Sequence, residues 1–189
     1  MSAVFTPTRL RISVDRYQKM VAVGVLTKYD RVELIEGEIL EMAPIGVAHA
    51  EVTDRLNRLF VTATGDSAIV RVGGPVDLGG FSEPQPDLQV LKNPGREGYR
   101  RAHPKAIDVL LLIEVSDSSL GFDRGAKRDL YARYAIPEYW VVDIGGQRVI
   151  AYLEPVDGRY QRVEEYRAGD TVCPRAIPDA RVAVDSLLA

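Results

Sequence analysis

Apolar and polar residues alternate along the chain in blocks that predict both helices and strands. Residues 47–64 carry apolar side chains at helical spacing, which predicts the main amphipathic helix. Residues 108–115 form a nearly unbroken apolar run, which is typical of a strand covered on both faces. A second helix is predicted over 123–135, and a short one, capped by Ser13, over 14–23.

Shorter segments predict the remaining strands. Alternation on both sides of Gly37 predicts a hairpin or a bent strand pair over 31–36 and 38–42. Residues 139–143 and 148–152 have the pattern of a second hairpin. The other candidate strands are 68–72, 76–78, 86–91, 160–166 and 182–184. Because helices and strands are mixed along the chain, the sequence predicts an α/β or α+β fold with a mixed central β-sheet flanked by helices.

Composition limits the class of protein. The chain has 189 residues, of which 46% are hydrophobic and 27% charged, as expected for one globular domain over 1–189. No apolar stretch approaches the roughly 20 residues of a membrane span. The N-terminal segment carries arginines where a secretory signal is apolar, so we expect a cytoplasmic protein with no membrane partner. Cys173 is the single cysteine, which excludes an internal disulfide and a multi-thiolate metal site.

The net charge of −3, from 24 basic and 27 acidic residues, does not by itself indicate a nucleic-acid-binding domain, which is usually basic. Local charges and bound cations can nevertheless offset the acids.

Two carboxylates stand where a carboxylate is costly unless it is paired or binds a metal. Glu114 interrupts the apolar run 108–115, and Asp87 follows Pro86 at the start of another predicted strand. If the two strands are neighbours, a strand spacing of about 4.8 Å brings the carboxylates about 5 Å apart. Two such charges repel by about 3 kcal/mol at an effective dielectric constant near 20. A divalent cation removes that repulsion, and hard oxygen ligands favour Mg²⁺ or Mn²⁺.

Lys127 lies about one turn into the predicted helix 123–135, which follows the strand of Glu114 after a short loop. That loop would return the ammonium group to the end of the strand, where it can approach the carboxylates. Two carboxylates, a divalent ion and a lysine are the groups of metal-assisted phosphodiester hydrolysis. Structural alternatives remain open: Asp87 can hydrogen-bond a turn, Glu114 can pair with a core arginine, and Lys127 can pair with Asp123.

The segment 112–143, LIEVSDSSLGFDRGAKRDLYARYAIPEYWVVD, resembles the Uma family of restriction endonucleases, a branch of the PD-(D/E)XK nuclease superfamily. The segment 33–39, His49 and Pro86-Asp87 match the same family in order and spacing, so the likeness covers roughly 10–155. The resemblance implies a restriction-endonuclease-like fold and a Mg²⁺- or Mn²⁺-dependent DNA endonuclease. By the same resemblance, Asp87 and Glu114 are the metal ligands.

The chain departs from the superfamily pattern at one position. That pattern has a lysine two residues after Glu114, where this chain has Ser116. The family carries a lysine on the next helix instead, which is Lys127 here. A further acid from the N-terminal part completes such sites, and Glu33 and Glu38 both match the family pattern. Strand alternation places Glu36 and Glu38 on one face and Glu33 on the other, unless Gly37 introduces a bulge. We favour Glu38, and the substitutes are Glu36 and Glu51.

His49, Glu33 and Ser116 are expected to support the metal ligands. His49 could also act as a general base, and its alternative role is that of a helix cap or a surface residue.

The loop 92–105 holds five Lys or Arg residues and one Glu. It joins the strands of Asp87 and Glu114, so we expect it to lie near the site and to contact phosphates without reading sequence. The residues proposed for this contact are Arg96, Arg100 and Arg101. The alternative is a solvated, flexible loop.

The sequence thus predicts a Mg²⁺- or Mn²⁺-dependent DNA endonuclease, in which Lys127 positions the nucleophile or stabilises developing charge. One alternative is a catalytically silent nuclease-fold module that binds nucleic acid or a protein partner, and another is a hydrolase of a different phosphate ester. The aromatic residues Tyr134, Tyr139 and Trp140 are either core or part of a homodimer contact. The choice between DNA and RNA, the target sequence and the biological process stay open.

Overall fold

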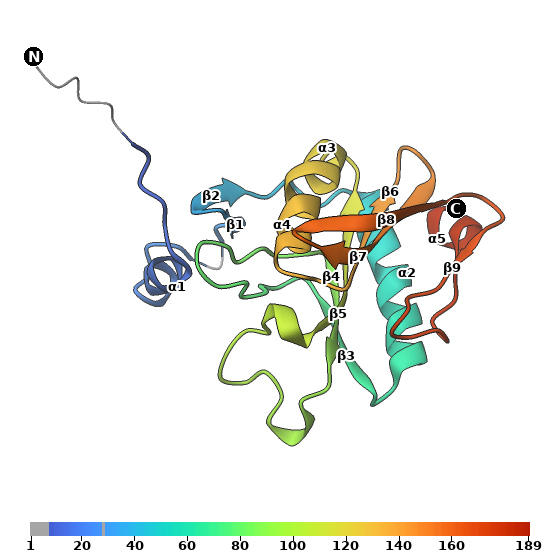
Figure 1. The fold of residues 1–189 in the computed structure, drawn as a ribbon, viewed down its shortest axis with the longest axis horizontal. Helices are drawn as coiled ribbons and strands as arrows, with labels where there is room; N and C mark the ends of the chain where they lie inside the picture. The colour runs from blue at the N-terminus through green and yellow to red at the C-terminus, as the bar shows by residue number, and fades with distance from the viewer. Residues whose placement is uncertain (1–7, 28) are drawn as a thin grey trace, which may run out of the picture.

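A mixed β-sheet forms the centre of the molecule. In the computed structural model, which describes residues 8–27 and 29–189, the main sheet has six strands in the order β3-β4-β5-β6-β7-β8 (Figure 1). These strands are β3 (Ala68–Val72), β4 (Leu88–Lys92), β5 (Val109–Ser116), β6 (Glu138–Asp143), β7 (Arg148–Val156) and β8 (Arg159–Tyr166). β5 and β6 are parallel, and all other neighbours are antiparallel. The predicted mixed sheet with flanking helices is confirmed.

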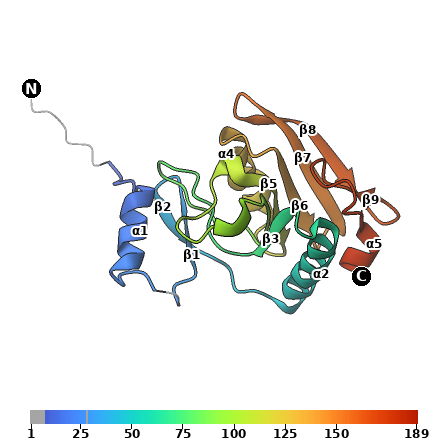
Figure 2. The ribbon, with the colours of Figure 1, turned by 90° about the horizontal axis from the view of Figure 1, so that it is seen from below.

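Helices cover both faces of this sheet. α2 (Val47–Thr64) and α5 (Val184–Leu188) lie on one face, and α4 (Arg128–Arg133) lies on the other (Figure 2). α4 continues α3 (Leu120–Phe122) through a π-helical turn, η3 (Asp123–Lys127). The core under α2 is apolar, whereas the core under α4 contains several buried tyrosines.

The alternation of β5 decides which side chain faces which helix. Leu111, Ile113 and Val115 pack in the core under α2, and Leu112 packs in the core under α4. Glu114 also points to the α4 side, because its carboxylate contacts side chains of η3 and α4. Every residue of β5 except one is buried, which explains its long apolar run and confirms the predicted strand.

The N-terminal part forms a small layer beside the sheet. It contains α1 (Val14–Ala22), which Ser13 caps as predicted, and the antiparallel pair β1 (Val32–Ile35) and β2 (Glu38–Glu41). Gly37 at the turn has φ +87°, and an added Cβ would lie 2.7 Å from Cβ of Arg11, so the turn requires glycine there. β1 is held against the chain that precedes β4, since Leu34 and Glu83 exchange backbone hydrogen bonds.

The C-terminal part adds a second strand pair, β9 (Thr171–Val172) with β10 (Val182–Ala183), before α5. Between β4 and β5 lie two short 3-10 turns, η1 (Gly95–Glu97) and η2 (Ala106–Asp108). Over the described ranges, no helix is long and apolar enough to cross a bilayer. Residues 1–7, part of the segment from which the absence of a secretory signal was inferred, lie outside the described residues.

Two predicted elements differ from the structure. Residues 76–78 are not a strand but a loop with one isolated bridge, and their amides bond to carbonyls of Pro84, Pro104 and Ser82. Their apolar alternation reflects burial of Val76 and Leu78 without a strand partner. The helix predicted over 123–135 begins three residues earlier, at Leu120, and contains the π turn, which no residue pattern marked. Such π turns are frequent at functional sites.

The expectation that the loop 92–105 lies near Asp87 and Glu114 is wrong. β4 and β5 are antiparallel, so their connection leaves the far end of β4, whereas Asp87 precedes β4 and Glu114 lies near the end of β5. The 5 residues of β4, at about 3.3 Å each, separate the two ends by roughly 16 Å. The arginines proposed as phosphate contacts therefore lie at the opposite end of the sheet; they are Arg96, Arg100 and Arg101.

Candidate functional site

Asp87 and Glu114 lie beside each other on neighbouring strands. The register pairs Leu88 of β4 with Ile113 of β5, which places Asp87, one residue earlier, next to Glu114. The backbone N–H of Val115 donates to Asp87 Oδ2 at 2.8 Å. The strands are therefore neighbours, as the sequence analysis assumed, and this hydrogen bond ties the Asp87 carboxylate to the end of β5.

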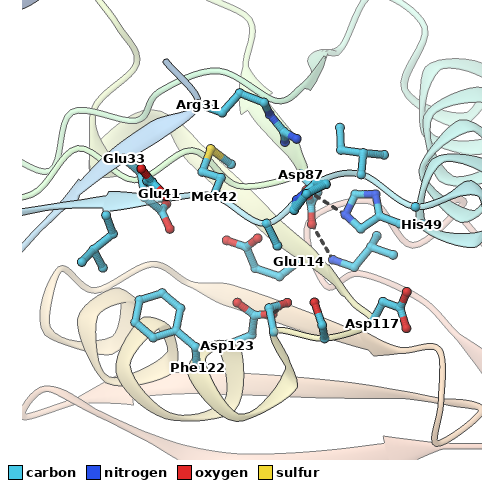
Figure 3. A pocket seen from close by; sticks show the side chains of 18 of the residues that line it. Arg31, Glu33, Glu41, Met42, His49, Asp87, Glu114, Asp117, Phe122 and Asp123 are labelled. Atoms are coloured by element: carbon cyan, nitrogen blue, oxygen red, sulfur yellow. Dashed lines mark hydrogen bonds and ion pairs between the residues drawn. The ribbon is translucent and has the colours of Figure 1, made fainter. Parts of the chain in front are cut away.

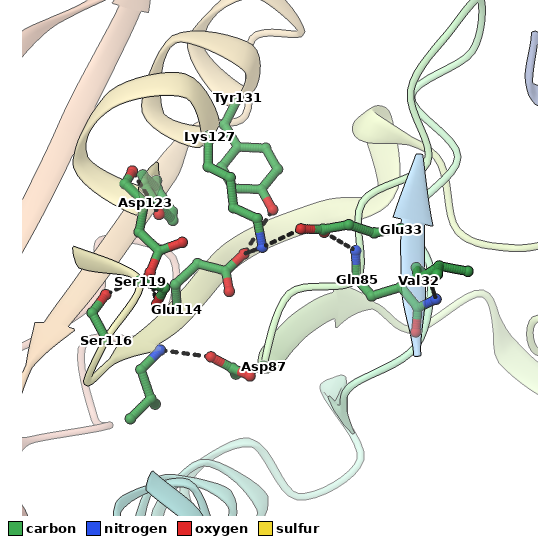
Figure 4. A network of polar contacts seen from close by, with 12 residues as sticks. Val32, Glu33, Gln85, Asp87, Glu114, Ser116, Ser119, Asp123, Lys127 and Tyr131 are labelled. Carbon is green, nitrogen blue, oxygen red and sulfur yellow. Dashed lines mark hydrogen bonds and ion pairs between the residues drawn. The ribbon is translucent and has the colours of Figure 1, made fainter. Parts of the chain in front are cut away.

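Glu114 is buried, with 3% of its surface exposed, and its carboxylate has two donors on the following helix. Lys127 Nζ from η3 and the Tyr131 hydroxyl from α4 each donate to Glu114 Oε1 at 2.9 Å (Figure 4). Within the described residues, Glu114 Oε2 accepts no hydrogen bond. The helix therefore returns Lys127 to the end of β5, and Lys127 pairs with Glu114 rather than with Asp123.

Glu33 of β1 completes this cluster. Its Oε1 lies 3.2 Å from Lys127 Nζ, and its Oε2 accepts the backbone N–H of Gln85 at 3.1 Å. Figure 4 shows the two carboxylates of Glu33 and Glu114 on either side of the ammonium group. Lys127 thus bridges an acid of the N-terminal layer and an acid of the central sheet.

The favoured Glu38 does not lie in this cluster. Its side chain is 55% exposed and pairs with Arg9 at 2.8 Å. The reason is that β1 packs against the chain before β4, while β2 is the outer strand of the pair, so β1 supplies the inward acid. The other two substitutes also form ion pairs outside the cluster, Glu36 with Arg133 and Glu51 with Arg55.

Burial and neighbouring charges shift the pKa values of this cluster. Burial raises the pKa of Glu114 well above its usual range, Lys127 lowers it, and Asp87 and Asp123 raise it further. Burial lowers the pKa of Lys127, but Glu114 and Glu33 outweigh burial, and the pKa ends above its ordinary value. Lys127 is therefore a charged ammonium group at neutral pH.

His49, in the first turn of α2, contacts Asp87 from the other side. Its Nε2 lies 3.1 Å from Asp87 Oδ1. The hydrogen bond with Asp87 raises the pKa of His49, although burial lowers it. Its Nδ1 is buried and finds no hydrogen-bond partner in the described part of the chain. Asp87 is thus held by a backbone N–H on one oxygen and by an imidazole on the other.

These side chains line a cavity of about 410 Å³ (Figure 3). Carboxylates outnumber cations on its wall: the acids are Glu33, Glu41, Asp87, Glu114, Asp117 and Asp123, and the basic residues are Arg31, His49 and Lys127. No described group of three or more His, Cys, Asp or Glu side chains forms a complete metal cage. Mg²⁺ is nevertheless commonly held by one or two carboxylates, with waters and substrate phosphates filling the remaining positions. Asp87 and Glu114 fit that requirement, because both present hard oxygen ligands in an acidic cavity.

Comparison with known proteins identifies the family of the chain and a solved structure with a similar fold. The model of the Uma2 family, described as "Putative restriction endonuclease", matches residues 14–185. The chain belongs to the Uma2 family. A crystal structure titled as a putative nuclease belonging to DUF820, from Anabaena variabilis, superposes with a TM-score of 0.75 over 94% of this chain and 97% of the other. The two chains are 16% identical, so the likeness shows a shared fold. No curated protein matches the chain.

In this Uma2 chain, Ser116 stands where the superfamily pattern has its lysine, and its hydroxyl group binds the side chain of Asp123 at the start of the following π turn. The hydroxyl groups of Ser116 and Ser119 donate to Asp123 Oδ2 at 2.7 and 2.5 Å. The Tyr139 hydroxyl donates to the Asp123 carbonyl at 3.1 Å. These bonds tie the end of β5 to the start of η3, the turn that carries Lys127.

Sequence analysis considered Asp123 only as an alternative partner of Lys127 and gave Tyr131 no role, although both lie four residues from Lys127 and that spacing indicates a common helix face. It also gave no role to Arg31, which lines the cavity. Arg31 lies two residues before Glu33, and this period-two spacing could have indicated that both face the same side of the strand.

Proposed function

We propose that the chain is a metal-dependent DNA endonuclease, formed as one domain over 1–189 and working in the cytoplasm. The supporting observation is the juxtaposition of Asp87 and Glu114 at one end of β4 and β5, with the Lys127 ammonium group 2.9 Å from Glu114. Membership of the Uma2 family, whose description is "Putative restriction endonuclease", supports the same class of reaction.

Asp87 and Glu114 would hold the ion, Mg²⁺ or Mn²⁺. A divalent ion at these carboxylates supplies Lewis-acid activation of the phosphoryl oxygen and of the attacking water. A cation there would also stabilise the ionised form of Glu114, whose pKa burial has raised. The hydrogen bond from the Val115 N–H keeps Asp87 aimed at the same point before any ion binds.

Lys127 is proposed to stabilise the charge that develops on the phosphate or to orient the attacking water. Glu114 and Glu33 hold its ammonium group in one place on the cavity wall, and a preorganised cation stabilises a transition state better than a mobile one. The amine therefore comes from the helix after β5 rather than from the strand position of Ser116. His49 positions Asp87.

Cleavage of both strands of a duplex would use two such sites, so a homodimer is part of the proposal. Tyr139 and Trp140 are fully buried and belong to the core, and Tyr134 is partly buried beside it. A dimer contact would therefore use other residues. In this proposal the arginines at the far end of the sheet contact DNA that extends beyond the site; these are Arg96, Arg100 and Arg101.

A plasmid assay tests the proposal. Purified protein should nick supercoiled plasmid with Mg²⁺ or Mn²⁺ and lose this activity in EDTA. Asp87→Asn should abolish nicking, because it removes the negative charge that would bind the ion. Asparagine still offers an acceptor for the Val115 N–H, so that hydrogen bond can be kept. Asp129→Asn, an acid on α4 that pairs with Arg128, is the matched control and should nick normally.

Metal-dependent nicking that survives Asp87→Asn would contradict the assignment. Salt-sensitive DNA binding with no turnover under any metal would instead identify a silent binding module.

A further inference from the structure

Arg31 stands apart from the other basic residues of the cavity. Lys127 is paired with Glu33 and Glu114, and His49 is paired with Asp87. Among the described residues, the side chain of Arg31 has no hydrogen-bond or ion-pair partner, although acids line the same cavity. Figure 3 shows its guanidinium group extending over the cavity toward Asp87. Arg31 is therefore a cation that remains available to a ligand.

The backbone of Arg31 is well fixed. Its carbonyl accepts the N–H of Met42 at 2.8 Å, which closes the open end of the β1–β2 pair. Two residues further along, Glu33 reaches Lys127. The segment that leads into β1 and the strand itself thus present one arginine and one acid toward the site, and only the arginine lacks a partner among the described side chains.

A second cavity, of about 340 Å³, continues from the first past Asp87. The two cavities share five lining residues, which are Arg31, Met42, Ile45, His49 and Asp87. Arg31 therefore stands at their junction. A volume above about 300 Å³ is within the range of small-molecule sites.

The lining of the second cavity combines apolar walls with hydrogen-bond acceptors. Ile45 and Val72 are 56% and 51% exposed, so they offer apolar surface that no part of the described chain covers. Asp54 lines the same cavity and makes no hydrogen bond with the described residues. A flat ring with exocyclic amino groups suits this combination, because apolar walls contact its faces and carboxylates accept from its amino groups.

We propose that Arg31 and the second cavity bind the nucleotide next to the cleaved phosphodiester: the guanidinium group holds its phosphate, and the cavity holds its base. This inference rests on the proposed nuclease function and adds a substrate class. A base paired within a duplex must first leave the helix to enter a side cavity, which costs free energy, so an unpaired DNA strand or an unpaired end is preferred over a duplex. Arginine suits the phosphate because its planar fork donates two parallel hydrogen bonds.

Fluorescence anisotropy with a labelled oligodeoxynucleotide tests the inference in EDTA, where metal-dependent cleavage does not occur. The probes are one short single strand, the same strand with abasic positions, and its duplex. Arg31→Gln should weaken binding of the single strand by about tenfold or more, as expected for loss of a charge-assisted hydrogen bond. Arg16→Gln, on the exposed side of α1 and outside both cavities, is the matched control and should bind as the wild type does.

A second pair of variants tests the base cavity. Ala50 lines the second cavity but not the first, so Ala50→Phe should fill it and reduce the affinity for the intact strand to that for the abasic strand. Ala48→Phe, on the same exposed helix turn but in neither cavity, should leave the difference between intact and abasic strands unchanged.

The inference is overturned if Arg31→Gln binds the single strand as tightly as the wild type, or if the duplex binds as tightly as the single strand. It is also overturned if Ala50→Phe leaves the difference in affinity between the intact and the abasic strand unchanged. The plasmid assay separates these outcomes from failure of the proposed function. A wild-type protein that nicks plasmid but fails the binding tests keeps that function, whereas one that neither nicks nor binds DNA loses both.

Discussion

The two faces of β5 use neighbouring residues of one strand for different purposes. On the α2 face, Ile113 and Val115 are enclosed by an apolar core that includes Phe60 and Trp140. On the α4 face, the apolar side chains stop before the end of the strand, and Glu114 is enclosed by charged and hydroxyl groups. One face of β5 therefore contributes to the apolar core, and the other carries a side chain of the proposed site.

The physical cost of burial explains this difference. An apolar side chain gains about 25 cal/mol for each Å² removed from water, and it needs no particular partner. A buried carboxylate loses its hydration, and its burial is tolerated only with specific donors. Lys127 and Tyr131 supply those donors from the helix that follows β5. A buried carboxylate is therefore tolerated at the end of β5 because the following helix lies beside that end and supplies its donors.

The largest expected effect comes from removing the cation of the polar face. Lys127→Met leaves Glu33 and Glu114 buried without a charge partner, which should lower the free energy of unfolding by about 3 kcal/mol or more. Plasmid nicking by the folded protein should fall by about a thousandfold, as when a preorganised donor is lost. Lys19→Met, at an exposed position of α1, should change neither quantity. Unchanged nicking by Lys127→Met would remove Lys127 from the mechanism.

The next effect concerns the apolar face. Ile113→Ala should lower the free energy of unfolding by about 3 kcal/mol, because it leaves a cavity in a fully buried core. Its folded fraction should nick plasmid at close to the wild-type rate. Denaturant titration together with nicking per folded molecule provides the measurement. A strong loss of nicking by the folded variant would show that the two faces are not separable.

A smaller effect is expected at Tyr131. Tyr131→Phe removes one hydrogen bond to Glu114 but leaves Lys127 in place, so unfolding should become easier by about 1 kcal/mol. Nicking should fall by several-fold rather than a thousandfold. Tyr152→Phe, on the same core side but with no contact to Glu114, is the control. If Tyr131→Phe abolished nicking, the hydroxyl group would have a direct chemical role.

The smallest effect is a dependence of stability on pH in the metal-free protein. Burial raises the pKa of Glu114, so the folded state binds this proton more tightly than the unfolded state does. The resulting stability is present below the ordinary carboxyl pKa of about 4.3 and is lost as the pH rises toward the raised value. The pKa of Lys127 is also raised, but its contribution is constant as long as Lys127 is protonated in both the folded and the unfolded state.

Glu114→Gln cannot lose a proton, so its unfolding free energy should fall less than that of the wild type over the same rise in pH. Denaturant titrations in EDTA at several pH values measure the two curves. If the unfolding free energies of the two proteins changed with pH in parallel, burial would not raise the pKa of Glu114 and the explanation would be contradicted.

Much of the fold could be predicted because local patterns decide it. The helix over 47–64, the buried strand of Glu114 and the hairpin around Gly37 follow from periodicity and turn residues, and the structure has each of them. The approach of Asp87 to Glu114 was predicted on the condition that their two apolar strands are neighbours, and the structure pairs them. The position of the loop 92–105, far from the site, could also have been predicted. A loop that joins two neighbouring antiparallel strands starts at the end of the first strand, and Asp87 directly precedes the beginning of that strand.

Other features depend on packing between distant segments. Simple alternation along the chain predicted that Glu33 and Glu38 face opposite sides, but the two-residue turn pairs Ile35 with Glu38, so Glu33 and Glu38 lie on the same face of the β1–β2 pair. Alternation also does not show which of the two strands meets the sheet. That choice depends on the bonds between Leu34 and Glu83. The π turn that carries Lys127 depends on the bonds of Asp123 to Ser116 and Ser119, which no local pattern marks.

The central claim is that Asp87 and Glu114 form one cation site, and Mn²⁺ titration by calorimetry tests it most directly. The account predicts saturable binding to the wild type and to Asp129→Asn, with at least about tenfold weaker binding to both Asp87→Asn and Glu114→Gln. Equal Mn²⁺ affinity in all four proteins, or no binding to the wild type, would contradict it.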